Sequence, residues 1–254
     1  MKINRIIMFG VFVLFSVQMF AQKTAEQKPE KTPFLGFKDN RDVYFQLMVG
    51  TGYSFYKMKG EEELISFLQN DGYKIGDMSG QIHFGLGLGV LIKQPEVRLL
   101  FDYRRDGYSS ASPVYINISF ASETKSFELE HDIRTISIGA EKLLFFDEEK
   151  KGFLGFGASY LWISDDRNEN LEYQIGSQTK NSQNTLGLTA KAWQIQASFG
   201  SVMSAKIFAE GRLGYQFQQS FKIESENKRP GRSAVGYEPN FNTFTFKFML
   251  GVLL

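Results

Sequence analysis

The chain has 254 residues, of which 43% are hydrophobic and 15% aromatic, with 24 glycines, 25 phenylalanines and no cysteine. This composition excludes a disordered polymer and a disulfide-stapled miniprotein. The mean hydropathy of -0.24 excludes a bundle of membrane helices, each of which needs about 20 apolar residues. A formal net charge of +1 provides no field that attracts nucleic acid, so no nucleic-acid partner is expected. A soluble β-rich domain or a membrane barrel remains.

The first residues have the pattern of a secretory signal peptide. Lys2 and Arg5 precede an apolar run from Ile6 to Val17, and cleavage after Ala21 makes residues 1–21 the signal peptide. An uncleaved anchor is the alternative, but the run is shorter than the ~20 residues that a span needs. Cleavage removes two positive charges, which leaves 27 basic against 28 acidic residues and a net charge of -1.

The mature chain begins with residues 22–41, which are charged, contain two prolines and predict a flexible periplasmic N-terminal arm. Beyond this arm, apolar residues alternate with polar or small ones in eight segments, as in strands with one apolar face. The segments begin near residues 43, 82, 97, 135, 154, 193, 207 and 243. Val43, Phe45 and Leu47 show the alternation in the first segment.

The connections between these segments alternate strictly between short and long. Short ones lie at Gln94-Pro95, 147–151 and Met203-Ser204, and the long ones span 57–79, 110–125, 166–186 and 221–238. A soluble lipocalin-like barrel or sandwich does not require this order, whereas an outer-membrane barrel has short periplasmic turns and longer extracellular loops. The sequence therefore predicts an all-β fold, an eight-stranded antiparallel up-and-down transmembrane β-barrel, over residues 42–254.

Large aromatic residues fall toward the ends of the segments that precede or follow the long connections. An interfacial aromatic girdle has this placement, although ordinary core packing explains any single one of them. The predicted girdle consists of Tyr53, Phe55, Tyr103, Tyr160, Trp162, Trp193 and Tyr215.

The signal peptide ending in Phe20-Ala21-Gln22, the eight amphipathic strands and the alternating final strand resemble the small outer-membrane β-barrel proteins of Bacteroidota. These proteins are often described as porin-like and are similar in architecture to OmpX and the OmpA membrane domain. The resemblance extends over residues 42–254 and implies the outer membrane of a Gram-negative bacterium. The chain departs from the family at Leu254, because assembly signals in such barrels usually end in an aromatic residue.

Charged residues occur on the same side of the strands as the glycines, which is the side predicted to face the lumen. Because an unpaired charge there is costly, we expect cross-strand pairing in two clusters, Arg98 with Glu141 and Glu210 with Arg212 and Lys247. Such clusters plug an eight-stranded barrel, and a charged constriction in a narrow pore is the alternative. The predicted lumen network is Arg98, Asp102, Arg104, Glu141, Glu210, Arg212 and Lys247.

Catalytic signals are weak. The two histidines are His83 and His131, and His131 lies beside Asp132 and near Glu130, which makes it the candidate for acid/base chemistry at the barrel mouth. No serine has a spacing that commits it to either histidine, and no phosphate cradle or metal-ligand pattern occurs. We therefore expect no enzyme, no cofactor and no metal.

The long connections are the expected site of specificity. Gly60 to Gly72 predicts a short helix in which Leu64, Phe67 and Leu68 share a face, and which serves either as a lid or as a docking surface. Basic residues of the fourth long connection meet lipid phosphates or are simply solvated; they are Lys222, Lys228, Arg229 and Arg232.

The predicted function is that of a non-enzymatic outer-membrane barrel with a structural or surface-interaction role through its four long extracellular loops. Its expected partners are outer-membrane lipid, lipopolysaccharide and a protein that contacts the loops. The alternatives are a narrow porin and an accessory subunit of an outer-membrane secretion or uptake machine.

Overall fold

The computed structural model describes residues 41–56, 59–70, 73, 80–118, 121–146, 150–204, 206–227 and 240–254. The predicted signal peptide and nearly all of the N-terminal arm lie outside these residues. The same is true of Lys228, Arg229 and Arg232.

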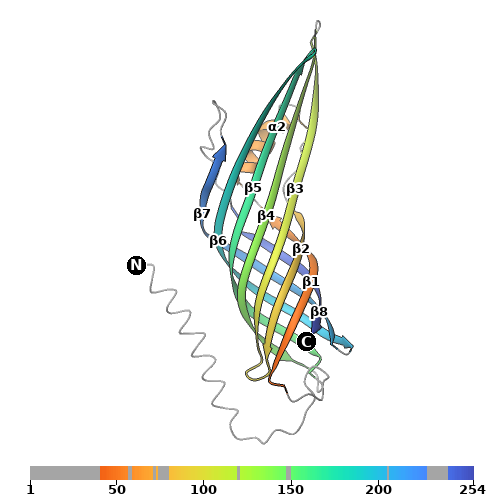
Figure 1. Ribbon diagram of the computed structural model, residues 1–254, viewed down its shortest axis with the longest axis vertical. Helices are drawn as coiled ribbons and strands as arrows, with labels where there is room; N and C mark the ends of the chain where they lie inside the picture. The colour runs from red at the N-terminus through yellow and green to blue at the C-terminus, as the bar shows by residue number, and fades with distance from the viewer. Residues whose placement is uncertain are drawn as a thin grey trace, which may run out of the picture.

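Eight strands form a closed barrel in which each strand pairs with the next in the sequence and the last pairs with the first (Figure 1). Every pairing is antiparallel. The predicted eight-stranded antiparallel up-and-down barrel is therefore confirmed. Its elements are β1 Val43–Tyr56, α2 Lys59–Asn70, β2 Gln81–Ile92, β3 Val97–Ile118, β4 Ala121–Phe145, β5 Gly152–Ile175, β6 Gln178–Ser204, β7 Ile207–Asn227 and β8 Thr243–Leu253.

The wall of the barrel is apolar on its outside. Along β1, Phe45 is 56% exposed while its neighbours Tyr44 and Gln46 are buried, and along β2, Phe84 is 70% exposed. A protein in water does not expose a continuous belt of this kind, because apolar surface is driven out of contact with water. The barrel is thus built to lie in a bilayer.

Two of the segments predicted as long loops are strands instead, so this part of the prediction is wrong. Residues 110–125 and 166–186 continue the strands, so that β3 pairs with β4 as far as Ile118 opposite Ala121, and β5 pairs with β6 as far as Ile175 opposite Gln178. In the sequence, the apolar alternation of the barrel does not continue into these segments, which is why they read as loops. We call the upper part of these four strands the extension. It consists of residues 107–118 of β3, 121–134 of β4, 163–175 of β5 and 178–191 of β6. The extension reaches far above β1, β2 and β8 in Figure 1.

The extension reverses the polarity of the barrel. On β4, Phe127, Leu129 and Ile133 are buried on the inward face, whereas Glu128 and Glu130 lie on the outward face. Inward and outward positions keep the same parity along the strand, because successive side chains always point to opposite faces. What changes is the side on which the apolar residues stand, and above the barrel they stand inside.

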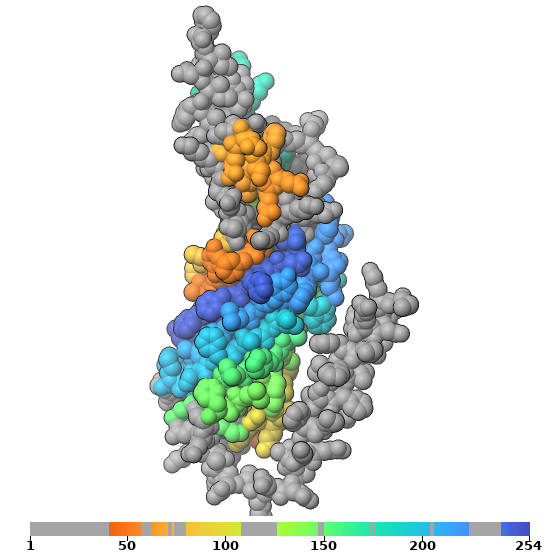
Figure 2. Space-filling view, turned by 180° about the vertical axis from the view of Figure 1, so that it is seen from behind, coloured from red at the N-terminus to blue at the C-terminus, as the bar shows by residue number. Residues whose placement is uncertain are grey.

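The predicted helix is confirmed as α2, with acidic residues in its first turn as the helix dipole favours. Ile65 and Leu68 are each 3% exposed and join the apolar cluster that includes Leu129, so the helix covers the inward face of the extension. Phe67 is 58% exposed, so the prediction that it shares a face with Leu68 is wrong. The helix is seen beside β3–β6 in Figure 1 and from the opposite side in Figure 2. Within the described ranges, no helix is long and apolar enough to cross a membrane.

Candidate functional site

Arg98, near the start of β3, is fully buried inside the barrel. Its Nε donates a hydrogen bond to Oε1 of Glu141 at 2.6 Å, and its Nη1 donates to Oε2 of Glu210 at 2.5 Å. Glu141 is the register partner of Arg98 on the neighbouring β4, whereas Glu210 is on β7 and is reached across the lumen. One guanidinium therefore ties together three strands.

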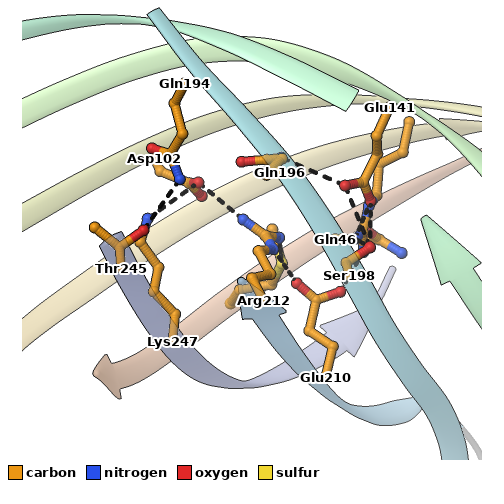
Figure 3. A network of polar contacts seen from close by, with 12 residues as sticks. Gln46, Asp102, Glu141, Gln194, Gln196, Ser198, Glu210, Arg212, Thr245 and Lys247 are labelled. Carbon is orange, nitrogen blue, oxygen red and sulfur yellow. Dashed lines mark hydrogen bonds and ion pairs between the residues drawn. The ribbon is translucent and has the colours of Figure 1, made fainter. Parts of the chain in front are cut away.

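Arg212 extends this arrangement toward the other charged side chains (Figure 3). It forms an ion pair with Glu210, and its Nη1 donates to Oδ2 of Asp102 at 2.8 Å. Nζ of Lys247 lies 3.6 Å from the same oxygen of Asp102. The prediction of two separate clusters is thus wrong, because Arg98 and Arg212 share Glu210 and join them into one.

We call Arg98, Asp102, Glu141, Glu210, Arg212 and Lys247 the lower network. It contains three cations and three carboxylates, so its formal charges cancel. Neutral groups complete the hydrogen bonding: Ser198 Oγ donates to Glu141 at 3.2 Å, and Gln46 Oε1 accepts from Arg98 at 3.3 Å. A Cβ at Gly87 would lie 2.6 Å from Oδ1 of Asp102, which explains why glycine faces the lumen at that position.

Arg104 belongs to a different group, nearer the extension. Its Nε donates to Oδ2 of Asp106 at 2.9 Å and its Nη2 donates to the hydroxyl of Tyr56 at 3.1 Å. Ser54 donates to the other oxygen of Asp106, Oδ1, at 2.8 Å, and Nδ1 of His83 lies 3.3 Å from this Oδ1. We call these five residues the upper network.

Sequence reasoning missed four members of the upper network. Asp106 continues the inward parity of Asp102 and Arg104 on β3, so its position was readable from the alternation. Ser54 and Tyr56 are likewise inward on β1, but the other inward residues of that strand carry no charge that would suggest a polar network. Only the closed barrel shows that these side chains meet.

The serine, histidine and aspartate of the upper network do not form a nucleophile triad. Ser54 Oγ and Asp106 Oδ1 both face Nδ1 of His83, at 3.0 and 3.3 Å, whereas a triad places them at opposite ring nitrogens. His131 is fully buried, and its Nδ1 lies 2.9 Å from Oδ2 of Asp165. The sequence neighbour Asp132 instead pairs with Arg105 on the outer face. Among the described residues, no three side chains of His, Cys, Asp or Glu are placed to hold a metal ion.

Apolar side chains also fill the lumen, in one cluster around and below the lower network and in another toward the extension. The lower apolar cluster lies at the end with the short turns, and sequence reasoning missed it because its members interrupt an inward set that is otherwise small or polar. It consists of Tyr44, Met48, Leu91, Leu100, Leu143, Phe153, Val202, Phe208, Met249 and Leu253. The upper apolar cluster is that of the extension and α2, which also includes Tyr56 and Phe241.

The aromatic residues predicted to form a girdle lie on the outward face. The Tyr160 ring centroid is 4.9 Å from that of Trp162 and 5.0 Å from that of Trp193. The Tyr215 centroid is 4.5 Å from that of Phe244, and Tyr53 packs on Phe55 with centroids 4.7 Å apart. Tyr103 and Trp162 share the register partner Ile136 on β4 and so lie in one row.

No protein-family profile and no curated protein sequence matches the chain. Among solved structures, Neisserial surface protein A is similar, with 11% identity, a TM-score of 0.39, and coverage of 84% of this chain and 97% of that chain. Ail of Yersinia pestis, in complex with a heparin analogue, has 9% identity and a TM-score of 0.35, and covers 84% of this chain and 98% of its own. CarO2 of Acinetobacter baumannii has 13% identity and a TM-score of 0.35 over 82% and 99%. At these identities and scores, neither the ligand of Ail nor any activity is transferred to this chain.

Proposed function

We propose that the chain is a non-enzymatic outer-membrane protein of a Gram-negative bacterium that holds a sheet above the membrane for contact at the cell surface. The reversal of polarity between barrel and extension is the observation that carries this proposal. A wall that is apolar outside suits a bilayer, and a sheet that is apolar inside and polar outside suits water. The same strands therefore belong to both media.

The direction of the extension follows from the chain ends and the turns. Nη1 of Arg41 donates to the backbone oxygen of Leu254 at 3.1 Å, so both ends of the described barrel lie together, opposite the extension. The turns β2–β3 and β6–β7 are at this end as well. Short turns face the periplasm in outer-membrane barrels, which directs the extension to the cell exterior.

The lumen supports a role without conduction. Its charged groups are neutralised in pairs, and apolar side chains fill the lumen toward both of its ends. An eight-stranded barrel has an interior just wide enough for side chains to fill. We accordingly propose a plugged lumen rather than a narrow porin.

The extension also has a free edge that can receive a partner protein. β3 pairs with β2 only as far as Asp106, and within the described chain no strand lies on that side of Gly107–Ile118. An unpaired edge presents backbone donors and acceptors that bind an extended peptide as an additional strand. We propose this edge as the contact site for a protein at the cell surface.

Orientation is tested by labelling single cysteines on intact cells, which is direct because the chain has no cysteine of its own. Ser177→Cys lies in the β5–β6 turn at the tip of the extension, and Gln94→Cys lies in the β2–β3 turn as a matched control; both native residues are exposed. A membrane-impermeant maleimide is expected to label residue 177 and to leave residue 94 unlabelled until the cells are lysed. Labelling of residue 94 alone on intact cells overturns the proposed orientation.

Conduction is tested in a planar bilayer with the purified, folded chain, and a known porin serves as the positive control. We expect no stable open-channel steps. Reproducible ohmic conductance would contradict the plugged lumen and favour the narrow porin.

Partner contact is tested by replacing Pro113–Ser126 with Asn-Gly, a two-residue connection that closes a hairpin. The shortened chain keeps the barrel and the pair Ser112 opposite Phe127. A photo-cross-linker attached at Ser177→Cys is expected to capture a surface protein from the full-length chain and less of it from the shortened one. Equal capture by both chains contradicts a contact at the β3 edge.

A further inference from the structure

A groove with a volume of about 740 Å³ runs along the outer wall where the barrel meets the extension. Its lower side is lined by Tyr103, Ile136 and Trp162, with Lys191 at the level of Trp162, and its upper side carries Arg134 and Lys222. Its size is that of a small-molecule site. The groove is therefore apolar toward the membrane and basic toward the exterior.

Strand register places these residues in two rows that cross β3–β7. The basic row runs through Arg105, Arg134, Ser164, Thr189 and Lys222, which are register partners in turn. The row below it, toward the membrane, runs through Tyr103, Ile136, Trp162, Lys191 and Ser220.

A β-bulge shapes the groove at Lys191. The pairing of β6 with β7 shifts between Lys191 and Ala192, because Gln219 is inserted between the partners Gln218 and Ser220. Bulges bend the strand locally and redirect its side chains. The wall thus bends where its outward face changes from Trp193 to Lys191.

The cations differ in how far they are already neutralised. Arg105 chelates Asp132 with contacts of 2.7 and 3.1 Å, and Arg134 pairs with Asp166. Lys191 is exposed and makes no ion pair with any described residue. Asp132 and Asp166 lie in the next row up, so the side of the cations that faces the membrane carries no acid.

This basic surface is confined to one side of the barrel. The outward residues of β1, β2 and β8 carry no charge at any described position. Chance solvation of a rim would distribute charge around the whole circumference, whereas a ligand site concentrates it on one face.

We propose that this groove binds a phosphorylated glycolipid of the outer leaflet, of the lipopolysaccharide type. Its phosphates would contact Lys191 and the basic row, and its acyl chains would lie against Tyr103, Ile136 and Trp162. The row spans four strand spacings, or about 19 Å, which exceeds one phosphate and fits two phosphates separated by sugars. The hydroxyls of Ser164 and Thr189 lie between the cations, where sugar hydroxyls need partners.

The assignment of the groove to the outer leaflet rests on the proposed function, but binding itself can be tested without it. The folded chain in phosphatidylcholine nanodiscs is titrated with diphosphoryl lipid A, and bound lipid is counted by native mass spectrometry. Dephosphorylated lipid A and phosphatidylglycerol are titrated in parallel. We expect diphosphoryl lipid A to bind most tightly of the three lipids. If either of the other two binds as tightly as diphosphoryl lipid A, the proposal is overturned.

Substitutions then locate the site. Lys191→Gln is expected to weaken binding of diphosphoryl lipid A about tenfold, as loss of one charged hydrogen bond does. Lys180→Gln is the matched control, because Lys180 is an exposed lysine of the same strand within the extension. Unchanged binding by Lys191→Gln, or an equal loss in Lys180→Gln, overturns the site. A heat-shifted electrophoretic mobility of each variant shows that it is folded.

The two proposals fail separately. If residue 177 is labelled from outside and lipid A does not bind, the groove assignment is wrong and the surface role stands. If lipid A binds to the nanodiscs but residue 94 is the one labelled on cells, the proposed orientation is wrong, and with it the assignment to the outer leaflet.

Discussion

The extension continues four of the eight strands of the barrel, yet the two parts follow opposite rules. On β4, Ile136 faces outward in the barrel and is 42% exposed, while Ile133 faces inward in the extension and is fully buried. Only three positions separate them. Apolar residues therefore stand outside in the barrel and inside in the extension, and on β4 they change sides between Ile133 and Ile136, where the proposed function puts the membrane surface.

The interiors differ as well. The interior of the barrel contains interlocked charges such as Arg98 with Glu210, whereas that of the extension contains the apolar cluster of Leu68 beside the buried pair of His131 with Asp165. Removing one partner of a buried ion pair leaves an unpaired buried charge, whereas removing an apolar side chain from a cluster leaves a cavity. The four substitutions below test this difference in order of expected effect.

Arg98→Ala tests the barrel most severely. It leaves Glu141 and Glu210 without their shared cation, so we expect the free energy of unfolding to fall by about 3–5 kcal/mol. The measurement is the urea midpoint of the chain in detergent. Arg98→Lys keeps the positive charge but lacks the planar guanidinium, so its urea midpoint is expected to lie between those of the wild type and Arg98→Ala. A midpoint for Arg98→Ala equal to that of the wild type contradicts a structural role for the lower network.

Leu129→Ala tests the extension. The side chain is fully buried, so we expect a local loss of about 2–4 kcal/mol while the barrel stays folded. Limited proteolysis should cut the extension, and the heat-shifted mobility of the barrel should persist. The exposed neighbour Glu130→Ala should be cut no faster than the wild type. Joint unfolding of both parts in Leu129→Ala would show that they are one cooperative unit.

Leu68→Ala tests the attachment of α2 to the extension. We expect faster amide exchange in residues 59–70, because about 2 kcal/mol of packing is lost. Phe67→Ala is the control, since Phe67 is exposed in the same helix turn. If the two variants exchange alike, α2 is not held by its buried face.

Arg105→Ala is expected to have the smallest effect. The side chain of Arg105 is 63% exposed, and a surface ion pair of this kind contributes little to stability because water and salt screen it. The urea midpoint should shift little, and less still at high salt. A fall in the urea midpoint as large as that of Arg98→Ala would show that ion pairs on the outer wall stabilise the chain as much as those in the lumen.

Much of this arrangement was readable from alternation alone. The eight strands and the inward parity of Arg98 and Glu141 follow from period two. The extension could also have been found, because Phe127, Leu129 and Ile133 alternate with polar residues in the phase opposite to Ile136 and Ile138. That change of phase resembles the end of a strand, because the apolar residues leave the outward face.

Contacts across the lumen could not be predicted in the same way. The pairing of Arg98 with Glu141 joins neighbouring strands, which sequence order alone suggests. The pairing of Arg98 with Glu210 joins β3 to β7, and it exists only because the barrel is closed and narrow. The same holds for the upper network, where Ser54 of β1 meets Asp106 of β3 past the strand between them.

The charged positions on the outward face of β4 also set a hydrophobic thickness. Arg134 and Lys142 share that face, with Ile136, Ile138 and Ala140 between them, and Lys142 lies 3.3 Å from Glu96 at the end with the short turns. The eight steps from residue 134 to 142 cover roughly 27 Å along the strand and about 20 Å once the strand tilt is included. A typical hydrocarbon core is about 30 Å thick, and the bacterial outer membrane is thinner than average. A bilayer that fits this apolar band is therefore a thin one, and a thicker bilayer would have to compress around the barrel.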